Sequence, residues 1–266
     1  MRAPARVAAF GYHEVTDDPS TSGFQRPGAL PYTFPVARFD AHLAAFAAGP
    51  LAPQRVTDVD LEQAGAHLFL TFDDGGRSAL HTADRLAARG WRGHFFIVTS
   101  LLGERGFLDA AGVRALHAAG HVIGTHSHTH PAIFRDLPFE RMVEEWRVSR
   151  DRLAEITGAA CDTASVPGGD LSRAVLRAAD ACGVRWLFTS EPWTAPRREG
   201  ACWVLGRAVA KAGMPARTAG ELARFRGWGR LLLIRRLKNA ARAAAPALYR
   251  RLVRRRVHPY GVTGSA

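Results

Sequence analysis

The sequence has little of several features that would place it in a specialised class of proteins. It has only three cysteines, Cys161, Cys182 and Cys202, an odd number without CxxC spacing. A disulfide framework and a thiolate zinc site are therefore not expected, and we expect buried, reduced thiols. No apolar run approaches the roughly 20 residues of a membrane span. The stretch MRAPARVAAFGYHEV also lacks the roughly 7–15-residue apolar centre of a signal peptide, so we expect a cytoplasmic protein.

Acidic residues are scarce in one part of the chain only. The formal net charge is +12, and the segment from Glu221 to Arg256 contains twelve arginines and lysines but a single glutamate. The first 220 residues are therefore close to neutral, and the charge is a property of the tail alone. We predict a main domain at 1–220 and a basic tail at 221–266.

Short apolar runs alternate with amphipathic segments along the main domain. Strands are expected at Val7–Tyr12, His67–Phe72, His94–Thr99, His121–Thr125, Asp162–Val166, Arg185–Thr189 and Cys202–Leu205. Helices are expected at Val36–Ala48, Ser78–Arg89, Asp109–Ala119, Pro138–Ile156 and Leu171–Cys182, several of them followed by a capping glycine. This alternation predicts an α/β fold with a parallel sheet. Seven strands suit a barrel better than an open sheet, but the pattern alone leaves both open.

Two motifs with charged or ionisable side chains follow strands of this pattern. The segment LFLTFDDGGRS ends an apolar run in two adjacent carboxylates, Asp73 and Asp74, which repel each other unless solvent or a cation offsets the repulsion. The segment THSHTHP places His126 and His130 four residues apart after another strand. The carboxyl ends of barrel strands meet at one face, so both motifs are expected at the same rim.

Two histidines and one carboxylate, with an open position for water, form the ligand set of a catalytic zinc site. We therefore predict a divalent metal, Zn²⁺ first and Co²⁺, Ni²⁺ or Mn²⁺ as alternatives, bound by His126, His130 and one of the two aspartates. The other aspartate could act as the general base on a metal-activated water. Either motif alone could be a solvated loop or an Asx turn, and only their combination in a βα chain favours the metal site.

The motifs TFDDG, HSxxH and a later Pro-x-Gly, in this order at strand ends, resemble those of the polysaccharide deacetylases, the NodB-homology or carbohydrate esterase 4 family. The leading YHEV segment is also similar to one that many members carry, and the resemblance spans roughly residues 7–210. It implies a distorted (β/α)7 barrel and metal-dependent hydrolysis of an N-acetyl group on a sugar. The site residues that it implies are Asp73 as catalytic base, Asp74, His126 and His130 as metal ligands, and Gly168 as a backbone donor to the oxyanion.

The sequence departs from the family pattern at two positions. Ser165 stands where the third motif usually has an arginine that orients the base. The last motif, usually Leu-x-His with the general acid, reads Leu205-Gly206-Arg207. An arginine cannot donate a proton at neutral pH, so the general acid is not identified, while Arg207 could contact a carboxylate or phosphate of the substrate.

The tail contains an apolar stripe at helical spacing, made of Leu233, Leu237, Ala241, Ala244, Leu248 and Leu252. Pro246 is expected to divide the run into two helices. A basic amphipathic helix suits an anionic membrane surface. The alternatives are a helix that packs its leucines on the barrel with its arginines in solvent, and a nucleic-acid patch, which the scarcity of aromatic residues disfavours.

These observations favour a metal-dependent N-deacetylase acting on a glycan or lipid-linked sugar in cell-envelope polysaccharide biosynthesis. The tail would then hold the protein peripherally at the inner face of the membrane. The alternative, motivated by Ser165 and Arg207, is a catalytically silent glycan-binding or membrane-scaffold protein on the same barrel. Retention of the metal ligands and of the base argues against this alternative, because a binding protein has no use for an activated water.

Overall fold

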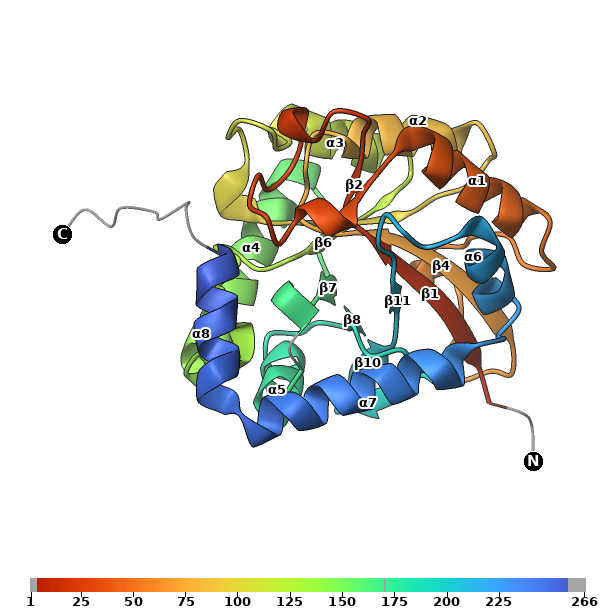
Figure 1. Cartoon of the computed structure of the whole chain (residues 1–266). Coiled ribbons are helices and arrows are strands. Elements are labelled where there is room, and N and C mark those ends of the chain that lie inside the picture. The colour runs from red at the N-terminus through yellow and green to blue at the C-terminus, as the bar shows by residue number, and fades with distance from the viewer. Residues whose placement is uncertain (1–3, 170, 258–266) are drawn as a thin grey trace.

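The computed structural model describes residues 4–169 and 171–257, and its centre is a curled sheet of nine strands with helices around it (Figure 1). All seven predicted strands are present. They are β1 (Arg6–Tyr12), β4 (Ala66–Phe72), β5 (His94–Ile97), β6 (Val122–Thr125), β7 (Thr163–Ser165), β8 (Trp186–Phe188) and β10 (Cys202–Leu205). The α/β class and the distorted (β/α)7 barrel are therefore confirmed.

The order of the strands in the sheet is β11-β1-β4-β5-β6-β7-β8-β10-β9. Two short strands extend the predicted set, β11 (Ala208–Val209), parallel to β1, and β9 (Arg197–Glu199), antiparallel to β10. The strands β10 and β11 lie near opposite edges of the sheet but are only two residues apart in the chain. Gly206 and Arg207 therefore cross the seam where the curled sheet closes.

A glycine is required at this crossing. A Cβ atom at position 206 would overlap the backbone oxygens of Glu191 and Trp193. The chain can therefore pass close to the loop after β8 only without a side chain, and the following residue, Arg207, turns into the barrel with its side chain fully buried.

The helices pack outside the sheet. They are α1 (Val36–Ala47), α2 (Ala79–Ala87), α3 (Ala110–Ala118), α4 (Phe139–Thr157), α5 (Arg173–Ala181) and α6 (Ala216–Ala223). Gly158 ends α4 in the left-handed conformation, with a φ of 70°, as the glycine following the predicted helix suggests. A small second sheet pairs β2 (Glu14–Val15) with β3 (Thr33–Phe34).

Alternation along the strands separates an outer core from the barrel interior. On β1, Phe10 and Tyr12 pack outward, in one cluster with apolar residues of α1, α2, α3 and α6. Val7 and Ala9 point inward, in a cluster that includes Phe69 of β4. On β1 and β4, apolar side chains therefore fill the interior near the start of the strands, and on β4 the buried polar residues Thr71 and Asp73 follow toward its carboxyl end.

Two helices follow the barrel, α7 (Trp228–Ala244) and α8 (Pro246–Val257), separated at Ala245 directly before the proline. The predicted boundary after residue 220 falls inside α6, and Leu222, Ala223 and Trp228 belong to the outer core. The side chains of Leu248 and Leu252 and residues 258–266 lie outside the described part of the chain. Within that part, no helix combines the length and apolarity that crossing a membrane demands.

Candidate active site

The register between β1 and β4 places Asp73 at the rim of the barrel. Tyr12 is paired with Phe72, and the Asp73 N–H donates to the Tyr12 carbonyl at 2.9 Å. Tyr12 and Phe72 both point outward into the core, so Asp73 points inward by alternation. Asp74 follows with a φ of 77°, a conformation that strains a non-glycine residue and turns the chain at the end of the strand.

The histidine loop after β6 is strained in the same way. The φ angles of Ser127 and His130 are 68° and 52°. A buried carboxylate from α4, Glu145, supports this conformation because it accepts the backbone N–H groups of His128 and Thr129 at 3.0 and 2.8 Å. A strained backbone conformation persists only where the surrounding structure stabilises it. The strained residues lie here at the site that both motifs predict.

Asp74, His126 and His130 come together as predicted. The Nε2 atoms of His126 and His130 lie 3.5 and 3.7 Å from Oδ1 of Asp74. One ligand atom from each of the three residues lies within 4.8 Å of the other two. Asp74 Oδ1 is buried and has no hydrogen-bond partner within the described part of the chain. Three convergent donors around an unsatisfied carboxylate oxygen fit a divalent metal ion.

The protonation states of these groups suit a cation. Burial raises the pKa of Asp74 well above its ordinary value, and the charges of Asp73 and Glu14 raise it further. Burial also lowers the pKa of His126 to about 4, and lowers that of His130 well below its ordinary value. Both imidazoles are therefore neutral with a lone pair to share, and a positive ion would offset the repulsion between the carboxylates.

Ser165 supports His126, one of the three candidate metal ligands. Its Oγ lies 2.5 Å from Nδ1 of His126, whose other ring nitrogen faces Asp74. A hydrogen bond at the remote nitrogen of a ligand histidine determines its tautomer and orients its ring. The residue that departs from the third family motif therefore contacts the candidate metal centre through His126.

Arg207 lies against the predicted base. Its Nη1 and Nη2 atoms donate to the two carboxylate oxygens of Asp73 at 2.8 and 2.9 Å, and Nη1 also donates to Thr71 Oγ1. Its Nε donates to the carbonyl of Thr189. Burial by itself would raise the pKa of Asp73, but the charge and hydrogen bonds of Arg207, together with smaller contributions from neighbouring histidines, hold that pKa well below its usual range. Arg207 thus faces the base, and not the open rim where a substrate anion would meet it.

His13, which follows β1 beside Asp73, was not among the predicted site residues. Gly11, two residues before it, points into the barrel toward the guanidinium of Arg207, so by alternation His13 points to the same side one layer nearer the rim. Its Nδ1 is buried and has no partner among the described residues. Burial lowers the pKa of His13 to about 4, against the opposing charge of Asp73. The YHEV motif contained this signal, because a histidine directly after a barrel strand lies at the catalytic rim.

Three further residues lie on β8 or in the loops after β7 and β8. Gly168 is exposed in the turn after β7, with a φ of 62° that suits glycine. Trp186 is buried in the interior cluster and is a core residue. Glu191, after β8, is ion-paired with Arg235 of α7, with Nε and Oε1 2.8 Å apart.

Comparisons with known proteins agree with this architecture. The family model described as polysaccharide deacetylase matches residues 61–187. No curated protein sequence matches the chain. Among solved structures, polysaccharide deacetylase BC0361 from Bacillus cereus is 15% identical with a TM-score of 0.69, over 82% of this chain and 69% of that chain.

For two further solved structures, the match extends over nearly the whole of the solved chain. The Streptococcus pyogenes deacetylase PplD, solved with acetate, is 16% identical with a TM-score of 0.67, over 81% of this chain and 97% of that one. A de-N-acetylase from Aggregatibacter actinomycetemcomitans is 17% identical with a TM-score of 0.67, over 82% and 99%. At these identities the likeness is one of fold. With the paired motifs at the rim, the family match makes residues 61–187 of the chain similar to the polysaccharide deacetylase (NodB-homology, carbohydrate esterase 4) family.

Proposed function

We propose that the protein is a metal-dependent hydrolase that removes N-acetyl groups from a glycan or lipid-linked saccharide. One observation carries this proposal: the three donors Asp74, His126 and His130 converge beside a second carboxylate, Asp73, that a buried arginine holds ionised. A site that only bound a sugar would need neither a metal triad nor an ionised base next to it.

Asp74 Oδ1 and the Nε2 atoms of both histidines would hold the ion, with Zn²⁺ first and Co²⁺, Ni²⁺ or Mn²⁺ as alternatives. When bound, such an ion polarises the acetyl carbonyl and lowers the pKa of water toward roughly 7. Ser165 keeps His126 in the orientation that presents Nε2 to the site.

Asp73 is the group that we assign to remove a proton from the attacking water. A base must be held in place and must be ionised before the reaction, and the bidentate contact with Arg207 provides both. In the family pattern the arginine beside the base comes from the third motif, where this chain has Ser165. Arg207 would thus be a positioning residue that reaches the base from the seam of the barrel.

His13 is the group that we assign to pass a proton to the leaving nitrogen. It is neutral in the resting site because of its lowered pKa of about 4, so it must receive its proton during the reaction. The proton that Asp73 removes from water is the one that the amine needs when the C–N bond breaks. His13 follows the strand next to that of Asp73, in the register that would let it relay this proton.

We also assign roles to Gly168 at the rim of the barrel and to the basic tail. Gly168 would donate its backbone N–H to the oxyanion formed at the acetyl carbon. We place the catalytic groups within residues 1–220. To the part of the predicted tail, 221–266, that follows the core residue Trp228 we assign a peripheral attachment to a membrane in cell-envelope polysaccharide biosynthesis. The alternative of a silent binding protein loses its motivation, because Ser165 and Arg207 both contact the site.

The test is metal dependence of acetate release. Protein purified without a histidine tag, stripped with a chelator and reloaded with one metal at a time, should regain release of acetate from an N-acetylated oligosaccharide. His126→Ala should neither bind the ion tightly nor regain activity. Stoichiometric metal binding without acetate release from any N-acetylated glycan would favour the silent protein, and full activity in chelator would contradict the metal assignment.

A further inference from the structure

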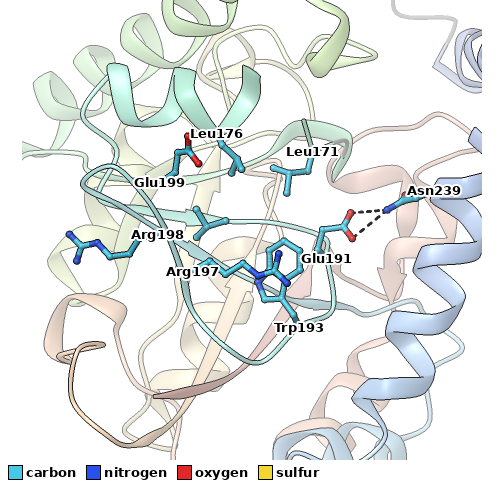
Figure 2. Close-up of a pocket in the computed structure, with 9 residues that line it drawn as sticks. Leu171, Leu176, Glu191, Trp193, Arg197, Arg198, Glu199 and Asn239 are labelled. Atoms are coloured by element: carbon cyan, nitrogen blue, oxygen red, sulfur yellow. Dashed lines mark hydrogen bonds between the residues drawn. The ribbon is translucent and has the colours of Figure 1, made fainter. Parts of the chain in front are cut away.

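The helix α7 is attached to the barrel by its polar face. Trp228 anchors its start, with the indole N–H donating to the Leu222 carbonyl at 2.9 Å. Two turns later Arg235 is ion-paired with Glu191 and donates to the Gly169 carbonyl. One further turn along, Asn239 points at the same carboxylate, as Figure 2 shows. The inward face of α7 is thus largely polar beyond its first turns.

The apolar residues of the helix point the other way. Leu233, Ile234 and Leu237 have exposed fractions of 59%, 41% and 63%. They are three of the four large apolar residues exposed in the described part of the chain. The alternative of a helix that packs its leucines on the barrel with its arginines in solvent is therefore contradicted for Leu233 and Leu237. The helix has this orientation because Glu191 is a buried carboxylate that requires a cationic partner, and Arg235 of α7 turns inward to pair with it.

Basic side chains surround this apolar face. Arg230, Arg236 and Lys238 are exposed beside the leucines, and neither α7 nor α8 contains an acidic residue. The pKa of Lys238 is lowered first by partial burial and then by the positive charges of Lys211, Arg235 and Arg242. The outward face therefore combines exposed leucines with concentrated positive charge.

We propose that the outward face of α7 docks on an anionic lipid surface. An interfacial helix places its apolar residues at the acyl boundary and its arginines and lysines among negatively charged headgroups. Charge complementarity favours lipid over a second copy of this chain, because two copies would bring two sets of cations together. A cavity of about 420 Å³ lies beneath α7, and the residues that line it include Glu191, Trp193 and Asn239 (Figure 2). Leu233, Ile234 and Leu237 do not line this cavity, so they would not contact a ligand bound in it.

The docked helix would lie beside the catalytic rim. Arg235 contacts the loops that follow β7 and β8, at the same edge of the sheet as Asp73 and His126. The proposed docking on lipid does not depend on the proposed function. The role that we give to this docking, to present the barrel to a membrane-bound saccharide, rests on the proposed function. Of the two proposed substrate classes, this placement favours the lipid-linked saccharide.

Sedimentation with vesicles tests the surface with the full chain. Protein should co-sediment with vesicles that contain phosphatidylglycerol, be released by salt, and bind far less to phosphatidylcholine alone. Leu233→Gln with Leu237→Gln should weaken binding by about tenfold or more, and Arg230→Gln with Arg236→Gln should remove the preference for anionic lipid. These side chains are exposed, so the thermal melt and acetate release from a soluble oligosaccharide should not change.

The controls are Leu30→Gln, an exposed leucine in a short 3-10 helix at Leu30–Tyr32, and Arg114→Gln, an exposed arginine of α3. Both should bind vesicles as the unmodified protein does. Equal loss in the controls, or unchanged binding in the leucine variant, would overturn the proposal. So would a lipid-free dimer that the leucine variant dissociates, or salt-sensitive binding to DNA in place of vesicles. Each result is independent of catalysis, so failure here leaves the deacetylase proposal standing.

Discussion

Arg207 and Asp73 form a bidentate ion pair at the closed seam of the barrel, with both carboxylate oxygens within 2.9 Å of the guanidinium. The arginine is fully buried and the aspartate is 5% exposed. The pair joins residues 134 positions apart in the chain. It explains how an ionised carboxylate is tolerated in a buried site, and it leads to the first prediction.

Replacing Arg207 should affect both stability and turnover. Arg207→Met leaves the Asp73 carboxylate buried without its partner, and the free energy of unfolding should fall by about 3–5 kcal/mol in chemical denaturation. Arg207→Lys should be milder in stability but still lower kcat, because an ammonium cannot hold both oxygens in one plane. Adding Asp73→Asn to Arg207→Met should recover part of the stability. A variant with normal kcat and a normal melt would show that the arginine does not position the base.

The two adjacent aspartates should separate in function. Asp73→Asn should retain the metal and lose turnover by a factor on the order of 10²–10⁴, the usual effect of removing a general base. Asp74→Asn should weaken metal binding, as measured by atomic absorption after dialysis. If Asp74→Asn keeps its metal and Asp73→Asn loses it, the two roles are reversed.

The contact between Ser165 and His126 should tune the metal affinity. Ser165→Ala removes the partner of His126 Nδ1, and metal affinity should fall by about 10–100-fold in a competition titration with a chromophoric chelator. Ser127→Ala is the comparison, since Ser127 Oγ accepts the backbone N–H of His130 at 3.1 Å and contacts no ring nitrogen. An unaltered affinity in Ser165→Ala would mean that packing alone orients His126.

The role of His13 can be tested with leaving groups of different basicity. His13→Gln should lower acetate release from an N-acetylated sugar, whose amine needs a proton to leave. The same variant should hydrolyse an aryl acetate ester at nearly the normal rate, because a phenolate leaves unprotonated. Equal losses on both substrates would indicate that His13 binds substrate or supports the fold, and not proton transfer.

Stability should fall as the pH is lowered from about 7 toward 4. His94 is fully buried, its Nε2 accepts the Val56 N–H at 2.9 Å, and its Nδ1–H donates to the Leu70 carbonyl. Burial lowers its pKa from 6.5 to about 4. Between these values the unfolded chain binds a proton that the folded chain does not, so stability declines with falling pH through this window and levels off below it.

His121 adds to the same effect, because its Nδ1 accepts the Gly93 N–H at 3.0 Å and burial lowers its pKa to about 4. For His94 the loss should be on the order of 2–3 kcal/mol. His94→Gln, which can still accept the Val56 N–H, should show a shallower dependence of the melting temperature on pH. A melting temperature that does not change between pH 7 and about 4 would contradict this account.

Local patterns predicted the strands and the metal triad well. A strand end followed by DD and another followed by HxxxH lie at one rim of a parallel barrel, so His126, His130 and an aspartate could be expected together without knowledge of distant contacts. The pattern left open which of the two aspartates joins them, and Asp74 was implied only by the family resemblance. The strands β9 and β11 were not predicted, because two or three residues carry no periodicity.

Contacts that depend on distant partners could not be predicted. The stripe on α7 predicts an amphipathic helix, but the choice of inward face depends on Glu191, 44 residues before Arg235. Likewise, nothing local to Leu205-Gly206-Arg207 indicates that its guanidinium reaches Asp73. Nor does anything local to the YHEV segment indicate that the ring of His13 lies close enough to Asp73 for the two charges to interact.

The two-residue crossing between β10 and β11 constrains how this chain can vary in length. The same Gly206-Arg207 dipeptide joins the edges of the sheet and delivers the side chain that holds Asp73. A residue inserted into this link, or deleted from it, would disrupt the seam and displace the guanidinium from the carboxylate in one step. We therefore expect an insertion scan to find sharp intolerance at this link, although it lies far in the sequence from Asp74, His126 and His130.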